Sequence, residues 1–421
     1  MRQETKFRCY PQGRNNQASP TRGWPTLFQP DPPSGFRMTV EPWRTLTYLE
    51  KKSILVSELI SNSTTGGQKM GRKQHFVPQF LLRHFSADPK QKLISLFYLP
   101  ESKIIKGVSI RDQAYKKNLY GSDQNLEKCF RTIETRVSVI INRIIQAEVI
   151  SLAPEEDVIL RYFVSLQINR TPEKISGMQS QFDKMMKVVF RHDPRVKDYL
   201  KDFTIKMTLP YHFMFLIALE ITPVLFDLKV SLLKNDSEED ILIGQHPAVV
   251  TNPLLYLKKW PGSLQGIGSK GALVLLPISP KHMLALYDRK RYGLRDFKRV
   301  GTLGKSDVDK INMLQFCYTT DCVYFCDTVK KIDFNGYKER TEEFRASDKN
   351  IIMTFKGRQE KSKRSEIVMT GSKEPPIRPI FDFIDPKIIA LHEDLGPTMD
   401  ISREGIRDFL DAFEESLPPV I

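Results

Sequence analysis

The stretch GRKQHFVPQFLLRHF, Gly71–Phe85, marks the point at which the folded part of this chain begins. A proline is tolerated in the first turn of a helix, where its missing N–H has no partner, so Pro78 predicts a short helix over the residues that follow it. Val77, directly before the proline, is pushed toward an extended conformation, which places His75 on a strand-like segment. The stretch therefore indicates the start of a domain. A catalytic role for His75 is the second interpretation of the same residues.

The preceding segment, residues 1–69, is rich in proline and polar residues and has neither a helical nor a strand period. Such a segment cannot bury enough apolar surface to offset a backbone entropy of about 1–2 kcal/mol per residue. We therefore expect a disordered N-terminal extension. Because Met70 stands directly before the quoted stretch, a second hypothesis is that translation starts at Met70 or Met38 and that the extension is mis-annotated.

Composition bounds the class of protein and its partners. The 421 residues are 40% hydrophobic and 27% charged, which is ordinary for a globular chain. A net charge of +14 favours nucleic acid as a partner, although the basic residues are mixed with acids, so a basic protein without such a partner is also consistent. Five cysteines without paired short spacings do not form a zinc motif, and reduced thiols predict a cytoplasmic location.

Helical periodicity dominates the first half of the folded part. Apolar residues recur every three or four positions over 125–148, and similar patterns predict helices over 154–173, 174–190 and 211–233. The last of these is nearly long enough to span a membrane. Glu220 lies at its centre, and an acid at mid-bilayer costs about 2.5 kcal/mol or more, so we expect a kinked buried helix and no membrane.

Strand patterns are concentrated in three places, and a helix is expected after them. Runs rich in β-branched and apolar residues predict strands at 92–99, 240–253 and 271–288, and a helix is expected over 305–326. The sequence thus predicts an α+β fold, a mostly helical main domain over 70–330 with a small sheet.

The C-terminal quarter has a different composition. Residues 331–378 are dense in charge and are predicted to be a basic linker or loop, while 379–421 form a tail with a short amphipathic helix. The stretch GIGSKG, Gly266–Gly271, matches the dinucleotide-binding letters. That motif requires a helix after it, whereas a strand is predicted here, so we expect no nucleotide cofactor.

Two charged residues lie on or beside the apolar faces of their helices. Glu134 and Arg170 must find partners there, because an unpaired buried charge costs several kcal/mol. One interpretation is a structural ion pair between two helices; the other is a pocket in which Arg170 holds a substrate phosphate and Glu134 acts as base or orienting group. If His75, Glu134 and His246 converged, they would suit a metal ion, although no H-E-x-x-H motif supports this.

The same residues carry a family resemblance. The segments QHFVPQFLLRHF, IETR around Glu134, LQINRTP around Arg170 and LLPISPKHMLAL resemble the bacterial domain-of-unknown-function family 4238 (DUF4238), over about residues 70–330. The resemblance implies an α+β protein of unknown biochemical role. By matching position it implies these shared residues: His75, Pro78, Glu134, Arg170, Pro247 and Ser279. Where relatives carry Thr-Ser-Asp before a residue and a proline, this chain has Ile243-Gly244-Gln245-His246-Pro247, which makes a metal-dependent enzyme less expected.

Two hypotheses of function follow. The first is a nuclease-like effector, associated with nucleic acid, whose pocket is formed by His75, Glu134, Arg170 and His246. The alternative is a non-catalytic scaffold or partner-binding module in which Glu134 and Arg170 form a structural ion pair. The sequence does not identify a substrate, a metal or a cofactor, and a protein partner is compatible with both hypotheses.

Overall fold

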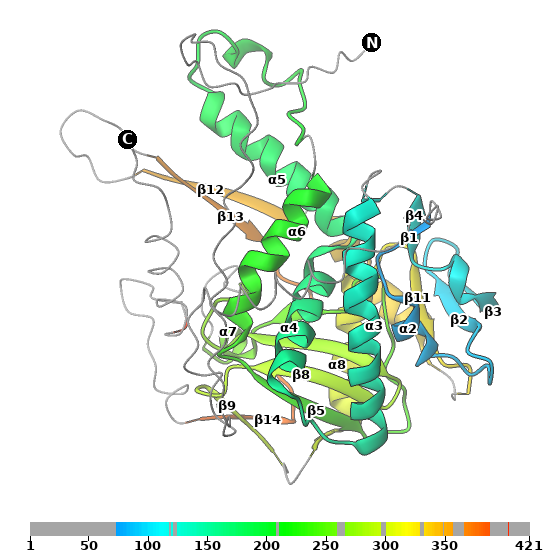
Figure 1. Ribbon diagram of the computed structural model, residues 1–421. Coiled ribbons are helices and arrows are strands. Elements are labelled where there is room, and N and C mark those ends of the chain that lie inside the picture. Colours follow the sequence, from blue (N-terminus) through cyan, green and yellow to red (C-terminus); the bar gives the residue numbers. More distant parts are fainter. Residues whose placement is uncertain are drawn as a thin grey trace, which may run out of the picture.

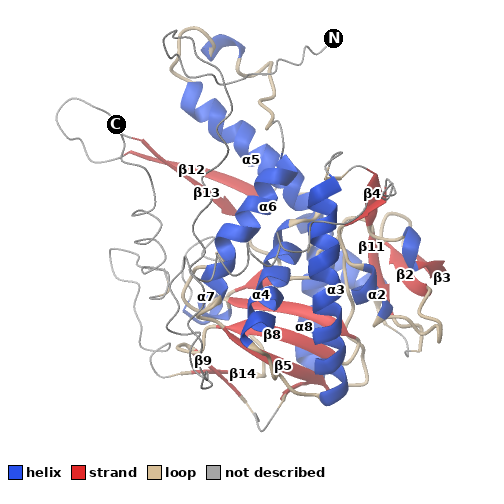
Figure 2. Cartoon of the chain, in the orientation of Figure 1, coloured by secondary structure: helices blue, strands red, loops and turns tan. Residues whose placement is uncertain are grey.

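The structure is a computed structural model. Figure 1 colours it by position in the sequence and Figure 2 by secondary structure. It describes residues 73–117, 119–120, 124–207, 210–258, 266–295, 300–328, 332–347, 349–356, 366–387 and 403. The predicted N-terminal extension and the predicted C-terminal amphipathic helix lie outside these residues. The described chain combines helices with several sheets, in agreement with the α+β expectation.

A five-stranded sheet forms the centre of the fold. Its strands, in spatial order, are β10 (Gly301–Leu303), β5 (Lys229–Asn235), β8 (His282–Tyr287), β7 (Leu273–Ser279) and β6 (Val249–Thr251). β10 runs parallel to β5, and the other neighbours are antiparallel. Every residue of β7 and β8 is buried, which explains why both strands are continuous apolar runs rather than alternating ones.

Helices cover both faces of this sheet, as Figure 1 shows. Successive side chains of a strand point to opposite faces, so Val274 and Leu276 pack with one set of helices while Leu273 and Leu275 pack with another. One face is covered by α3 (Gln124–Ala147), α4 (Pro154–Asn169) and α6 (Pro210–Ile221), and the other by α8 (Lys305–Cys317). The result is a sandwich of three layers with a core on each side of the sheet.

The central helix α4 is buried on nearly all sides, from Val158 to Ile168. Its polar residues are therefore satisfied inside the fold. Arg161 is paired with Asp157 at 2.9 Å and donates to the Leu228 carbonyl at 2.9 Å, and the Ser165 hydroxyl donates to the Ala218 carbonyl at 2.8 Å. These bonds fasten α4 to α6 and to the segment that follows it.

The start of the domain follows the expectation from Pro78. The predicted strand-like segment is β1 (Lys73–His75), and the predicted helix is α2 (Gln79–Arg83), directly after the proline. β1 pairs with β4 (Tyr115–Lys117). A second sheet lies beside it, in which β2 (Leu93–Tyr98) pairs with both β3 (Lys103–Ser109) and β11 (Cys322–Phe325).

Two helix predictions were too long. The helix expected over 211–233 ends at Ile221, because Pro223 follows within a 3-10 turn, Thr222–Leu225, and residues from Lys229 form strand β5. The helix expected over 305–326 ends at Cys317, since Cys322–Phe325 is rich in β-branched and aromatic residues and pairs with β2. Among the described residues, no helix is long and apolar enough to cross a membrane.

The charge-dense segment 331–378, predicted as a linker or loop, holds regular structure. It contains α9 (Phe334–Ala346) and the antiparallel strands β12 (Asn350–Lys356) and β13 (Glu366–Ser372). The prediction was wrong here because the high density of charged residues drew attention from four side chains at helical spacing that are buried in the structure. They are Phe334, Tyr337, Thr341 and Phe344. β12 lies against α5 (Pro172–Phe190), as Figure 1 also shows.

The GIGSKG loop binds a buried arginine through its backbone carbonyls. The carbonyls of Ile267 and Ser269 accept hydrogen bonds from the Arg403 side chain, which also pairs with Asp227 at 2.7 Å. The strand β7 follows this loop, as the sequence predicts. The carbonyls of this loop thus bind the cationic side chain of Arg403.

The three-layer packing predicts how much stability is lost when a buried side chain of β7 is shortened. Leu276 is 0% exposed and packs toward α4, so Leu276→Ala should lower the free energy of unfolding by about 2–5 kcal/mol. Chemical denaturation of purified protein measures this. Ile104→Ala on β3, where the side chain is 47% exposed, serves as a control with little effect. Equal losses in both variants would contradict the assignment of the core.

Candidate functional site

The guanidinium of Arg170 is the most enclosed charge near the predicted site. Arg170 ends helix α4, and its side chain is 0% exposed. Its Nη2 lies 2.8 Å from Glu134 Oε1 on α3, and its Nε donates to the Phe76 carbonyl at 3.0 Å. The ring of Phe130 lies 5.4 Å below the guanidinium. Arg170 therefore joins the first strand to two helices.

Further groups complete this cluster. The Gln167 carboxamide, with its oxygen turned toward the guanidinium, accepts from Nη2 and Nε at 3.1 and 3.2 Å. Burial is the largest single influence and disfavours the charge of Arg170. Glu134, Tyr120 and Glu127 together outweigh it, so the pKa of Arg170 lies above its ordinary value. We call Phe76, Glu134, Gln167 and Arg170 the Arg170 cluster. It leaves Glu134 only partly exposed, at 25%.

His75 lies near this cluster without joining it. Its Nε2 contacts the Arg111 carbonyl at 3.1 Å and Gln79 Nε2 at 3.2 Å. Burial lowers the pKa of His75, although the bond to Arg111 and the charge of Glu134 act in the opposite direction. His75 is therefore held by its own neighbours, within electrostatic reach of Glu134.

Thr171 directly follows Arg170 in the sequence and faces the other side of the junction between α4 and α5. Its hydroxyl accepts from the Lys174 amide at 3.3 Å, which caps α5, and shares a hydrogen bond with His246 Nδ1 at 3.1 Å. Consecutive residues thus serve two places: Arg170 belongs to its cluster, and Thr171 contacts His246.

The loop that carries His246 is clamped to helix α8 and the turn after it. The Gly244 amide donates to Gln315 Oε1 at 2.8 Å, and the Gln245 amide donates to Thr319 Oγ1 at 3.2 Å. A Cβ at position 244 would lie 2.2 Å from Thr319 Oγ1, so only glycine allows this approach. The clamp fixes the backbone on which His246 stands.

Gln245 has a structural role in the same region. Its side-chain oxygen accepts from the amides of Thr320 and Asp321 at 3.2 and 2.8 Å, and from the Thr320 hydroxyl at 3.0 Å. These bonds order the turn between α8 and β11. The position at which the family resemblance implies a carboxylate is thus occupied by an amide that holds a turn.

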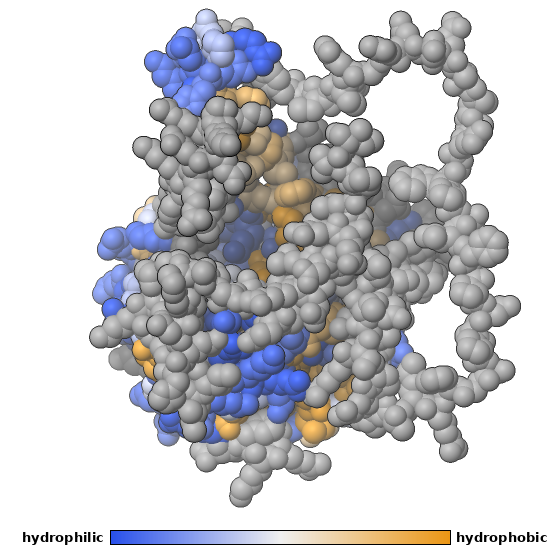
Figure 3. Space-filling view, turned by 90° about the vertical axis from the view of Figure 1, so that its left-hand side faces the viewer, coloured by the Kyte–Doolittle hydropathy of each residue, from blue (hydrophilic) through white to orange (hydrophobic). Residues whose placement is uncertain are grey.

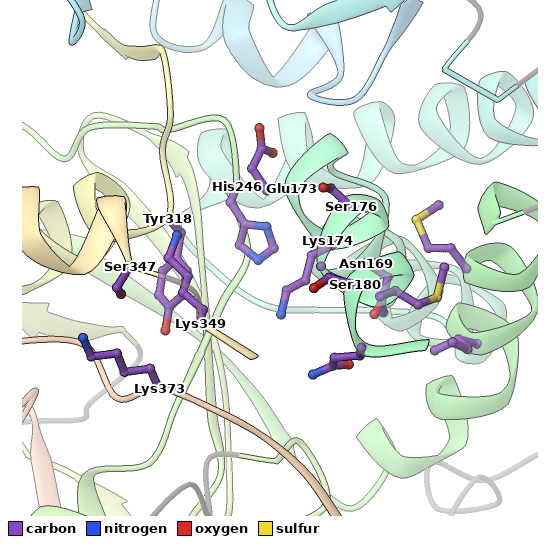
Figure 4. Close-up of a pocket in the computed structure, with 15 residues that line it drawn as sticks. Asn169, Glu173, Lys174, Ser176, Ser180, His246, Tyr318, Ser347, Lys349 and Lys373 are labelled. Atoms are coloured by element: carbon purple, nitrogen blue, oxygen red, sulfur yellow. The ribbon is translucent and has the colours of Figure 1, made fainter. Parts of the chain in front are cut away.

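His246 opens onto a cavity of about 560 Å³, which we call the lysine cavity. Figure 4 shows Lys174 and Asn169 on one side of it, with Tyr318, Ser347, Lys349 and Lys373 on the other. The lining residues come from α4, α5, α6, the His246 loop and the ends of α8, α9, β12 and β13. They are Asn169, Glu173, Lys174, Ser176, Gly177, Met178, Ser180, Gln181, Met214, Ile217, His246, Tyr318, Ser347, Lys349 and Lys373.

The charges of this lining are strongly unbalanced. Three lysines, Lys174, Lys349 and Lys373, face one acid, Glu173, whose Oε1 already accepts from the Thr320 hydroxyl at 3.1 Å. Lys174 is open to the cavity, yet the surrounding protein desolvates its ammonium and lowers its pKa, and Lys349 lowers it further. Burial likewise lowers the pKa of Lys349. A cavity of this kind is electrostatically suited to an anion.

The imidazole of His246 responds to the same surroundings. Burial places its pKa well below the ordinary value of 6.5, and Lys174 and Lys349 push it in the same direction. His246 is therefore neutral at pH 7. Its ring lies 5.7 Å from that of Tyr318.

Apolar side chains form one part of the wall. Met178 on α5 and Met214 and Ile217 on α6 line the cavity. At the height of these two helices, the space-filling view shows hydrophobic and hydrophilic residues next to one another in a hollow surface (Figure 3). The cavity thus offers positive charge and apolar surface to the same ligand.

The structure separates the four residues predicted to share a pocket. Glu134 and Arg170 form a direct pair with His75 nearby, whereas His246 lies across the α4–α5 junction. In the described part of the chain, no three His, Cys, Asp or Glu side chains are grouped so that they could hold a metal ion. His246 contacts Thr171 and Glu134 pairs with Arg170, so the condition under which His75, Glu134 and His246 would suit a metal ion is not met among the described residues.

The sequence analysis missed the lysines of the cavity. Lys174 lies two residues after the end of the motif LQINRTP around Arg170, and this proximity was a signal for its position. Lys349 and Lys373 stand in the segment predicted as a linker, and only the β12–β13 hairpin brings them to the cavity.

Comparison with known proteins gives one match. Residues 73–328 match the family described as "Protein of unknown function (DUF4238)". No curated protein and no solved structure matches the chain.

The Arg170 cluster predicts a large effect from a partly exposed acid. Glu134→Ala leaves the buried guanidinium without its carboxylate and should lower the free energy of unfolding by about 3 kcal/mol. Asp327→Ala, which breaks the exposed Lys106–Asp327 pair, should cost less than about 1 kcal/mol. Urea denaturation of both variants makes the comparison, and similar small losses would contradict the structural weight given to Glu134.

The neutral His246 predicts a pH dependence of stability. Its pKa is lower in the folded than in the unfolded chain, so the unfolded state binds more protons below pH 6.5 and stability falls there. The slope from this residue approaches about 1.4 kcal/mol per pH unit. His246→Asn should therefore lose less stability than the wild type between pH 7 and 5.5, as measured by denaturation. If the free energy of unfolding changed with pH equally in the wild type and in His246→Asn, this assignment to His246 would be contradicted.

Proposed function

The chain belongs to the DUF4238 family of proteins of unknown function, and from that premise we propose that it binds the phosphate groups of nucleic acid in the lysine cavity. The observation that carries this proposal is the convergence of Lys174, Lys349 and Lys373 on one cavity that has a single acid. The net charge of +14 supports it, since a basic surface attracts polyanions over a distance.

The proposal assigns different roles to the residues expected to be catalytic. Glu134 and Arg170 act as the structural ion pair of the alternative hypothesis, and His75 is a neighbour of that pair. Of these four residues His246 alone lines the cavity, where its neutral imidazole is placed to accept a proton from a water molecule that attacks a bound phosphate ester. If the proposed site carries out a nuclease-like reaction, His246 is the residue among these four that takes part in it.

A cytoplasmic location belongs to the same proposal. The cysteines Cys129, Cys317, Cys322 and Cys326 are free thiols, as in a reducing compartment.

The test is salt-dependent binding of a fluorescein-labelled single-stranded oligonucleotide. The wild type should bind with an affinity that falls as salt rises, because each phosphate contact to a single strand contributes about −0.7 to the slope of log K against log salt. Lys349→Gln should weaken binding and make the slope shallower by about that amount.

The matched control is Lys90→Gln, an exposed lysine in the loop before β2, which should leave both quantities unchanged. Equal losses in Lys90→Gln and Lys349→Gln would mean that the overall charge binds, not the cavity. Absence of binding at low salt would contradict the proposal and favour the partner-binding hypothesis.

A further inference from the structure

We propose that the lysine cavity accepts one nucleotide with a terminal phosphate, either a free nucleoside monophosphate or the phosphorylated end of a single strand. This inference rests on the proposed function and specifies its ligand. The phosphate lies among Lys174, Lys349 and Lys373, and the base lies against Met178, Met214 and Ile217.

The division of the cavity into two walls carries the first step. The cationic groups come from the start of α5 and from the residues that flank β12 and β13, whereas the apolar side chains come from α5 and α6. Figure 4 shows Lys349 and Lys373 on the side that also holds Tyr318. A ligand that fills both walls needs an anionic group joined to a flat apolar body, and a nucleotide has both.

The size of the cavity carries the second step. A volume of about 560 Å³ lies within the range of small-molecule sites, about 300–1,000 Å³. A site for the interior of a duplex is instead an open surface that follows many phosphates. The cavity therefore fits a single unit or a strand end.

The charge of the cavity carries the third step. A phosphodiester within a strand carries one negative charge, whereas a terminal phosphate monoester carries about −1.5 to −2 at pH 7. Desolvation lowers the pKa values of Lys174 and Lys349, and a neighbouring cation lowers each further, Lys349 for Lys174 and Arg345 for Lys349. A doubly charged anion among the lysines offsets these effects better than a singly charged one. A cavity lined by three lysines and one acid therefore favours the terminal phosphate.

Polar side chains between the two walls can contact the remaining part of the ligand. Asn169, Ser180 and Gln181 supply both donors and acceptors at the cavity surface. Polar groups of this kind fix the orientation of a small ligand in its site. They match the hydroxyls of a sugar and the edge of a base.

The experiment is isothermal titration calorimetry of the full chain with three probes: adenosine monophosphate, inorganic phosphate and adenosine. The monophosphate should bind at least about tenfold more tightly than either part alone, because burial of the base against Met178, Met214 and Ile217 adds to the contacts of the phosphate. A 5′- or 3′-phosphorylated ten-nucleotide strand should likewise bind more tightly than the same strand without the phosphate or than a blunt duplex.

Two neighbouring residues of α6 provide a matched pair of variants. Ile217 lines the cavity, whereas Leu216 is 53% exposed and does not. Ile217→Ala should weaken the monophosphate by about tenfold and leave inorganic phosphate unchanged, while Leu216→Ala should change neither. Lys349→Gln should weaken both phosphate-bearing probes.

The outcomes separate this inference from the proposed function. If phosphate binds in a Lys349-dependent manner but the monophosphate binds no more tightly, the single-nucleotide inference is overturned and phosphate binding stands. If no phosphate-bearing probe or strand binds, both fail. Equal effects of Ile217→Ala and Leu216→Ala would overturn the placement of the base.

Discussion

The fold around the candidate site depends on one buried cation that has to be neutralised. Arg170 is withdrawn from water, so its charge is tolerable only with the Glu134 carboxylate and the Phe76 carbonyl beside it. Those partners belong to α3 and to the residue directly after β1. The guanidinium therefore holds the residue after β1, helix α3 and the end of α4 in one arrangement.

This constraint also sets the geometry of the lysine cavity. The chain turns from α4 into α5 immediately after Arg170, and Thr171 and Lys174 on the far side of that turn are held against His246 and the cavity. The buried charge of Arg170 thus holds the surrounding elements in place, whereas the lysines that line the cavity are accessible to a ligand. Within one short segment, Arg170 is assigned to stability and Lys174 to binding.

Much of the architecture was predictable because it depends on local rules. Pro78 located the first helix, and the apolar positions of Glu134 and Arg170 required that they find partners. The lysine cavity was not predictable, because Lys349 and Lys373 reach it only through the pairing of β12 with β13 and the packing of β12 on α5. Contacts so distant in sequence leave no periodic signal, and the dense charge of this segment favoured a loop prediction.

The central claim is that the cationic wall of the cavity holds a phosphate group. A crystal structure of the full chain with adenosine monophosphate tests it most directly. The account predicts density for the phosphate within hydrogen-bonding distance of the Nζ atoms of Lys174 and Lys349, and for the base beside Ile217. Adenosine monophosphate bound elsewhere on the chain, with the lysine cavity empty at a saturating concentration, would contradict the account.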